Sequence, residues 1–220
     1  MTWCPSWRRW RPEVPPFTVL HVCMGNICRS PMAERLFAAA VRDRAARFAG
    51  SGSPAPGYVD ALVHSHSAGT GGWHAGEEMN PPAARQIRAR GGDVDGFAAR
   101  KLRSEHIDGA DLVLTATADQ QDYVVALRPD AAARTFVLGE FGRLLGQVDP
   151  TGLPPAGPGP DAVHARGVAL VAAVDGLRAG AEPLPADDLD DPWGRGEQTF
   201  TRIGDEIEQT TGALARLLLP

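Results

Sequence analysis

A short loop between an apolar segment and an amphipathic one constrains this chain more than any other feature. Residues 17–22 are largely apolar and contain β-branched side chains, a pattern typical of a buried strand. Ser30 and Pro31 favour a helix start, and after them apolar residues recur at helical spacing, at Met32, Leu36, Phe37, Ala40 and Val41. The sequence therefore predicts a strand, a tight loop that begins at Cys23, and a helix N-terminus.

A loop of this kind is suited to binding an anion and to activating a thiol. The backbone N–H groups of a helix N-terminus converge on one point, and the helix dipole adds positive potential there, which also stabilises a thiolate. Arg29 offers a planar fork for two phosphate oxygens, Gly25 permits a close backbone approach, and Asn26 tolerates the left-handed conformation. The alternative interpretation is a buried structural Cys23 beside a surface arginine.

The full string CMGNICRSPMAE, which begins at Cys23, resembles the phosphate-binding loop of the low-molecular-weight protein tyrosine phosphatases almost residue for residue. The resemblance implies that Cys23 is the nucleophile and that Arg29 holds the equatorial phosphate oxygens. It also implies that the Ser30 hydroxyl stabilises the thiolate as it leaves, and that Asn26 and Glu34 support the loop. The residues expected to bind the substrate in this loop are Met24, Gly25, Asn26, Ile27, Cys28 and Ser30.

The second cysteine of the loop, Cys28, has two interpretations. In the resembled family, a second cysteine can form a reversible disulfide with the nucleophile, and this protects the nucleophile from irreversible oxidation. A small buried residue beneath the loop explains Cys28 equally well. Both interpretations of Cys28 stay open at this point.

A phosphocysteine mechanism also needs a carboxylic acid that protonates the leaving oxygen. Two Asp-Pro pairs compete for this role, at Asp149 and at Asp191. The second resembles the family's acid loop more closely, because an aromatic residue follows the proline and a terminal helix comes next. We expect Asp191 to act as the acid and then to activate water, with Asp190 as a minor rival. The alternative is a solvated cluster of aspartates at 187, 188, 190 and 191.

The expected substrate is a protein that carries phosphotyrosine. Ile27 lies inside the loop, where the related bacterial phosphoarginine phosphatases tend to have threonine, so isoleucine favours phosphotyrosine. Trp73 matches the aromatic residue of the family's variable loop, and Trp193 follows the expected acid. Two aromatic walls would stack on a phenyl ring, although each tryptophan could instead pack on the core. A cognate tyrosine kinase is a possible further partner.

The bulk properties fit a cytoplasmic enzyme without a cofactor. The chain has 220 residues and a net charge of −5, which argues against general nucleic-acid binding, and it has no apolar run long enough to span a bilayer. The expected chemistry needs no metal, because Arg29 and the loop backbone supply the charge stabilisation. The histidines lack the spacing of metal ligands and are interpreted as structural or surface residues: His21, His64, His66, His74, His106 and His164.

Strand-like and helix-like segments alternate along the chain, which predicts a parallel sheet with helices on both faces. The further strands are expected at residues 62–67, 111–115 and 135–138, and the further helices at 82–90, 119–127, from Glu140, at 162–178 and at 197–219. The fold class is therefore a single three-layer α/β domain with a four-stranded, twisted parallel sheet. It is Rossmann-like or flavodoxin-like, and the resemblance implies the phosphatase I type.

The domain boundaries follow from composition. Residues 17–220 are expected to form the phosphatase domain, and residues 147–185, rich in Pro and Gly at their start, to be an insertion before the acid loop. Residues 1–16 combine arginines with tryptophans and lack the apolar stretch of a secretory signal. We interpret them as a disordered N-terminal extension, with a membrane-surface role as the alternative.

One departure from the family pattern concerns the support of the loop. The family often has a histidine before its Ala-Arg-x-Leu pattern that bonds the loop asparagine, and here Phe97 stands at that place. The loop asparagine must therefore be held differently.

Other function classes remain. A three-cysteine arsenate reductase is excluded because no cysteine follows Cys28, but a glutaredoxin-coupled reductase is not. A phosphoarginine phosphatase and an inactive phosphotyrosine-binding module also fit, although the latter would not need both a nucleophile and an acid. A cysteine phosphocarrier would have the thiol loop without a need for Arg29 and Asp191.

Overall fold

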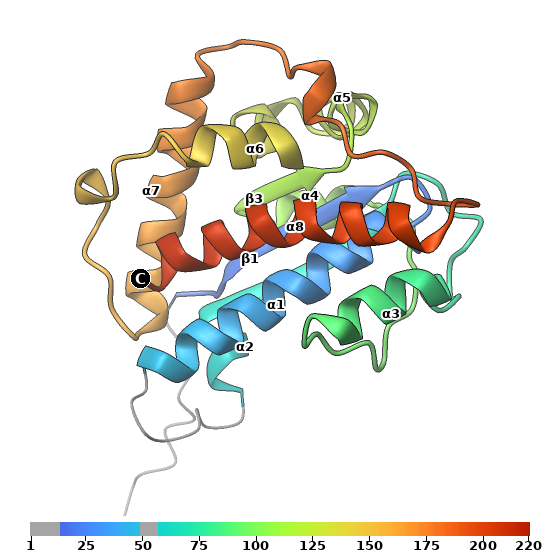
Figure 1. Ribbon diagram of the computed structural model, residues 1–220. Helices are drawn as coiled ribbons and strands as arrows, with labels where there is room; N and C mark the ends of the chain where they lie inside the picture. The colour runs from blue at the N-terminus through green and yellow to red at the C-terminus, as the bar shows by residue number, and fades with distance from the viewer. Residues whose placement is uncertain (1–13, 49–56) are drawn as a thin grey trace, which may run out of the picture.

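The computed structural model describes residues 14–48 and 57–220, and a four-stranded parallel sheet lies at its centre (Figure 1). The strands are β1 (Phe17–Cys23), β2 (Val63–Gly69), β3 (Leu112–Thr115) and β4 (Thr135–Val137), in the order β2-β1-β3-β4. All three strand pairs are parallel, and β1 is central. The carboxyl end of β1 is Cys23, so the thiol lies at the edge of the sheet where ligands bind in open α/β folds.

Helices cover both faces of the sheet, as the alternation of side chains along β1 requires. Phe17 and Val19 pack in one cluster with side chains of α1 (Arg29–Phe48), α6 (Leu138–Leu145), α7 (Pro160–Arg178) and α8 (Glu197–Leu218). Leu20 and Val22 point the other way, towards α4 (Ser104–Asp108) and α5 (Ala118–Leu127). The predicted fold class, three layers around a four-stranded parallel sheet, is confirmed.

Several predicted boundaries are wrong. The second strand does not begin at Leu62, because Leu62 ends the short helix α2 (Tyr58–Leu62), and β2 continues to Gly69. The fourth strand stops before Leu138, which begins α6 two residues earlier than expected. The helices α2 and α4 are missing from the prediction, since five residues are too few to show a 3.6-residue period. The remaining ends differ by one or two residues.

The segment at 147–185 contributes to the core of the domain. Its helix α7 buries Val163, Leu170 and Val174 in the same cluster as the sheet. Gly167 lets α7 approach β1 closely, because a Cβ there would lie 2.5 Å from the ring of Phe17. The segment therefore packs as part of one domain, while its status as an insertion stays a prediction. Most of the expected N-terminal extension, residues 1–13, lies outside the described residues.

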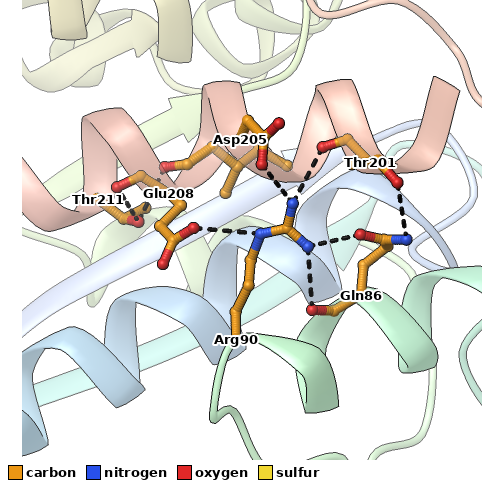
Figure 2. A network of polar contacts seen from close by, with 7 residues as sticks. Gln86, Arg90, Thr201, Asp205, Glu208 and Thr211 are labelled. Atoms are coloured by element: carbon orange, nitrogen blue, oxygen red, sulfur yellow. Dashed lines mark hydrogen bonds and ion pairs between the residues drawn. The ribbon is translucent and has the colours of Figure 1, made fainter. Parts of the chain in front are cut away.

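Arg90 joins the end of α3 (Pro81–Ala89) to α8 (Figure 2). Its guanidinium donates to the backbone oxygen of Thr201 at 3.1 Å and to the Glu208 carboxylate at 3.1 Å, and it pairs with Asp205. Gly204 makes room for this contact, since a Cβ there would lie 2.9 Å from Cζ of Arg90. Arg90 thus links the two helices, which the contacts of Gln86 with Thr201 and of Arg85 with Glu197 also join.

None of the helices within residues 14–48 and 57–220 is long and apolar enough to cross a membrane.

Candidate active site

The loop after β1 places a cysteine thiol beside a serine hydroxyl. Sγ of Cys23 lies 3.0 Å from Oγ of Ser30, and both residues are buried. Asn26 takes the left-handed conformation, with φ of 54°, as its residue type permits. The loop then enters α1 at Arg29, so the backbone N–H groups of the first turn lie next to the thiol. This is the predicted strand, loop and helix arrangement.

Asn26 is the central support of the loop. Its Nδ2 donates to Oγ of Ser30 at 2.9 Å and to Oγ of Ser67 at 2.8 Å, and its Oδ1 accepts from the backbone N–H of Arg100 at 2.9 Å. Ser67 in turn donates to the carboxylate of Glu34 at 2.6 Å. The side chain of Asn26 therefore connects the loop and the first turn of α1 to β2 and to the segment around residue 100.

The expected difference in loop support is found at Phe97. This side chain packs against an apolar cluster and is not among the partners of Asn26. The next segment supplies the missing contact through the backbone N–H of Arg100. Asn26 is thus held by one backbone N–H and two serine hydroxyls, whereas the family often uses a histidine for this contact.

Arg29 connects the loop to the acid segment. Its guanidinium is buried, with Nη1 donating to the backbone oxygen of Leu189 at 3.0 Å and Nη2 lying 3.2 Å from Oδ2 of Asp191. Nε of Arg29 is buried and has no hydrogen-bond partner among the described residues. A buried, charged N–H group without a hydrogen-bond partner costs folding free energy. An anion in the pocket that accepts a hydrogen bond from Nε would remove this cost.

Each of the four neighbouring aspartates has its own partner, although only Asp187 is buried and the other three are exposed. The partners are the guanidinium of Arg143 for Asp187, the backbone N–H of Ala118 for Asp188, Arg202 for Asp190 and Arg29 for Asp191. Of these four carboxylates, Asp191 lines the pocket that contains Cys23. Its side chain is 49% exposed, which leaves it accessible to a leaving group.

The competing Asp149 has a local structural role. Its Oδ1 accepts from the backbone N–H of Thr151 at 2.9 Å and from the Thr151 hydroxyl at 2.8 Å, which caps a short 3₁₀ turn. Asp149 is not part of the pocket lining.

A pocket of about 220 Å³ joins the predicted residues. It is lined by Cys23, Met24, Gly25, Ile27, Cys28, Arg29, Trp73, His74, Asp191 and Trp193. The predicted residues Asn26 and Ser30 are not in the lining; they are buried, bonded to each other. Trp73 and Trp193 are 65% and 64% exposed, so neither is packed away in the core. Trp73 folds over Gly71, where a Cβ would lie 2.1 Å from the indole.

His74 also lines the pocket, a position that its interpretation as a structural or surface residue does not include. A single histidine without ligand spacing gives a weak sequence signal. Its position directly after Trp73 was the signal that could have found it.

The environment of Cys28 keeps this thiol protonated. Burial raises the pKa of Cys28 to about 12, and the nearby Cys23 and Asp191 act in the same direction. Arg29 opposes this effect to a smaller extent. Cys28 is therefore a neutral thiol at pH 7, which fits a buried residue under the loop.

Metal-ligating residues are not gathered at this site. Within residues 14–48 and 57–220, no three or more His, Cys, Asp or Glu side chains come together in a group that could hold a metal ion.

Comparisons with known proteins show the family of this chain. The family model described as low molecular weight phosphotyrosine protein phosphatase matches residues 18–149. The low molecular weight protein-tyrosine-phosphatase YfkJ of Bacillus subtilis is 36% identical over 102 residues, which are 46% of this chain and 57% of YfkJ. A low molecular weight protein-tyrosine-phosphatase of Streptomyces coelicolor is 37% identical over 134 residues, 61% of this chain and 70% of that protein.

Solved structures extend the likeness over most of the chain. The structure of the YwlE arginine phosphatase from Geobacillus stearothermophilus has a TM-score of 0.57 and 25% identity, and covers 91% of this chain and 92% of that one. The family match ends before the acid segment, so Asp191 lies beyond it. The match covers more than half of the chain and includes the whole phosphate loop. The chain therefore belongs to the low molecular weight phosphotyrosine protein phosphatase family.

Proposed function

We propose that this protein hydrolyses phosphotyrosine in proteins through a phosphocysteine intermediate. The observation that carries the proposal is one pocket that contains the thiol of Cys23, the carboxylate of Asp191 and the buried guanidinium of Arg29, whose Nε has no partner among the described residues. A nucleophile, an acid and an anion-binding group are the three parts that such a reaction needs. Membership of the family supports the same conclusion.

In the first step, the thiolate of Cys23 attacks phosphorus. The loop N–H groups and Arg29 hold the equatorial oxygens and stabilise their charge in the transition state. The bond between phosphorus and the phenolic oxygen breaks, and Asp191 donates its proton to that oxygen. The exposed position of Asp191 at the pocket suits contact with a departing group.

In the second step, water hydrolyses the phosphocysteine. Asp191, now a carboxylate, accepts a proton from the attacking water, the S–P bond breaks and inorganic phosphate leaves. The thiolate that is released accepts a hydrogen bond from Ser30, whose oxygen lies 3.0 Å from Sγ. This bond stabilises the leaving thiolate. The charge stabilisation in both steps comes from Arg29 and the backbone, so the mechanism uses no metal.

The walls of the pocket favour an aromatic substrate. Trp73 and Trp193 both line it and are exposed enough to stack on a phenyl ring. Ile27 adds an apolar side chain to the lining, which favours phosphotyrosine over phosphoarginine. The natural substrate is then a tyrosine-phosphorylated protein, made by a cognate tyrosine kinase. We place the reaction in the cytoplasm, where a catalytic thiol stays reduced.

A panel of substrates tests this function. The protein, treated with a chelator, is given one peptide in phosphotyrosine, phosphoserine and phosphoarginine forms, and arsenate with glutaredoxin and glutathione. We expect phosphate release from the phosphotyrosine peptide, and none after the Cys23→Ser substitution. Preference for the phosphoarginine peptide, reduction of arsenate, or saturable binding without turnover would each replace the proposal with the corresponding alternative.

A further inference from the structure

Three cationic side chains follow one another from the neighbourhood of the pocket to the edge of the sheet. They belong to Arg100, Lys101 and Arg103, which we call the basic patch; all three are exposed and none lines the pocket. No carboxylate within residues 14–48 and 57–220 forms an ion pair with any of them. Other arginines at the surface do pair with a carboxylate, among them Arg85, Arg128 and Arg202.

Lys101 is held beside the wall of the pocket. It forms a parallel bridge with Gly69, the last residue of β2, whose N–H donates to the backbone oxygen of Arg100 at 2.9 Å. The stem of the Lys101 side chain lies against Gly72, where a Cβ would come within 3.0 Å of its Cδ. Gly72 directly precedes Trp73, which lines the pocket. A cation therefore lies one residue outside the pocket lining.

Arg100 continues the patch along β2, the outer strand of the sheet on this side. Its Nε donates to the backbone oxygen of Ser67 at 2.7 Å, which lays the side chain along the strand edge. Its two terminal nitrogens bond to no group in the described part of the chain. They are therefore available to a ligand at the surface.

Arg103 lies near the same histidine as Arg100. Burial lowers the pKa of His106, and the charges of Arg100 and Arg103 act in the same direction, against the opposing effect of Glu105. The backbone N–H of Arg103 also donates to Nδ1 of His106 at 3.2 Å. Because arginine and lysine are charged throughout the pH range of an assay, the positive charge of the patch does not depend on a protonated histidine.

The chemistry of the patch points to a ligand that carries carboxylates. Neighbouring cations without counter-ions repel one another, and a ligand that brings negative charges to them removes this repulsion. The chain as a whole has a net charge of −5, so the positive surface is local. The phosphate of the substrate belongs to the loop and Arg29 inside the pocket, so the patch is left for the residues around the phosphotyrosine.

We propose that the basic patch docks aspartate and glutamate side chains of the substrate protein, a few residues from the phosphotyrosine. The inference rests on the proposed function and names the class of protein substrate, one in which the phosphotyrosine lies in an acidic stretch. The patch lies outside the pocket, so the phosphate and the acidic residues are bound at the same time by separate groups.

The first test compares two phosphotyrosine peptides, one with flanking aspartates and glutamates and one with the corresponding amides, asparagine and glutamine. The measured quantity is the ratio of kcat/KM for the acidic peptide to kcat/KM for the amide peptide, at low and at high salt. Lys101→Glu and the double variant with Arg103→Glu reverse charges of the patch. Arg88→Glu, at an exposed position in the last turn of α3, is the matched control for net charge.

We expect the wild type to prefer the acidic peptide at low salt and to lose much of this preference at high salt, because salt screens exposed charges. The ratio should fall about fivefold in Lys101→Glu and about tenfold or more in the double variant, and Arg88→Glu should leave it unchanged. Equal kcat/KM of the wild type for both peptides, or equal effects of Arg88→Glu and Lys101→Glu, would overturn this inference alone. Failure of the wild type on both peptides and on p-nitrophenyl phosphate would overturn the proposed function.

A second test maps the contact and does not depend on turnover. Lys101 is the only lysine of the chain, and a carbodiimide couples a carboxylate to an amine with loss of water. The Cys23→Ser variant is treated with a carbodiimide and the acidic phosphotyrosine peptide, which has an acetylated N-terminus and no lysine. Mass spectrometry should find an amide bond between the peptide and Lys101, and much less of it when the tyrosine is not phosphorylated. Coupling at the α-amine of the chain without coupling at Lys101 would contradict the docking site.

Discussion

Nη2 of Arg29 lies 3.2 Å from Oδ2 of Asp191, so the arginine of the phosphate loop also contacts the expected general acid. The same guanidinium holds the backbone oxygen of Leu189. One buried side chain therefore fixes two positions of the acid segment, while its Nε has no hydrogen-bond partner among the described residues and is available for an anion. The distance between nucleophile and acid depends on this contact.

The first prediction concerns the planar shape of the Arg29 guanidinium. Arg29→Lys preserves the charge but cannot reach Leu189, Asp191 and a phosphate at once, because an ammonium has no planar fork. We expect kcat for p-nitrophenyl phosphate to fall by about 10²–10³, as for loss of one preorganised transition-state donor. Circular dichroism should show an unchanged fold. A decrease in kcat of less than tenfold would contradict the dual role.

The second prediction concerns the conformation of Asn26. Asn26→Ala removes three hydrogen bonds and leaves at φ 54° a residue that tolerates the left-handed conformation less well than asparagine. We expect a loss of about 3 kcal/mol in the free energy of unfolding, measured by urea denaturation, together with reduced kcat. Asn26→Gly loses the same bonds without the strain, so it should be about 1 kcal/mol more stable than the alanine variant. Equal stability of the two variants would show that the left-handed backbone costs nothing there.

The third prediction concerns the link that Arg90 makes between α3 and α8. Arg90→Met keeps much of the apolar stem and loses the bonds to Thr201, Asp205 and Glu208. Since both carboxylates are more than half exposed, we expect a loss of only about 1–2 kcal/mol and a Tm lower by about 5 °C. Arg128→Met removes an ion pair at the surface and should leave the Tm unchanged. Equal effects of the two substitutions would argue against such a link.

The fourth prediction concerns acid stability. Burial lowers the pKa of both His21 and His66 to about 3, and neighbouring histidines add to the shift. In the unfolded chain a histidine has a pKa of about 6.5, so below that pH the unfolded state binds protons that the folded state excludes. The stability contributed by neutral His21 and His66 is thus fully present above pH 6.5 and is lost as the pH falls towards 3.

Urea denaturation at pH 7.5 and pH 5.5 measures this effect. Each buried histidine should cost about 1.4 kcal/mol for each pH unit below 6.5. His21→Leu cannot titrate and should lose about 1.4 kcal/mol less than the wild type between the two pH values. The same pH dependence in both proteins would mean that His21 does not stay neutral in the fold.

The phosphate loop could be predicted from the sequence because its parts are contiguous. A strand pattern, the CMGNICRS string and a helix pattern follow each other directly, and local geometry brings them together without knowledge of the rest of the chain. Trp73 and Asp191 are far from the loop in sequence and were found through resemblance. The structure places both in the pocket with Cys23.

The missed contacts involve groups without a sequence signal. Leu189 holds Arg29, and Arg100 holds Asn26, through backbone atoms that any residue would supply. Glu77 contacts Nδ1 of His74 across a turn of four residues, and neither residue gives a sequence signal for this contact. Tertiary structure decides these contacts, so periodicity and motif spacing could not reveal them.

The most direct measurement of the central claim is to trap the phosphoenzyme. The Asp191→Asn variant is mixed with p-nitrophenyl phosphate, quenched in acid within milliseconds, digested and analysed by mass spectrometry. Because p-nitrophenolate leaves readily without an acid, and the variant cannot activate water, the account predicts a phosphoryl group on the sulfur of Cys23, and none when Cys23→Ser is added. Rapid phosphate release without a phosphocysteine, or a phosphoryl group on another residue, would contradict it.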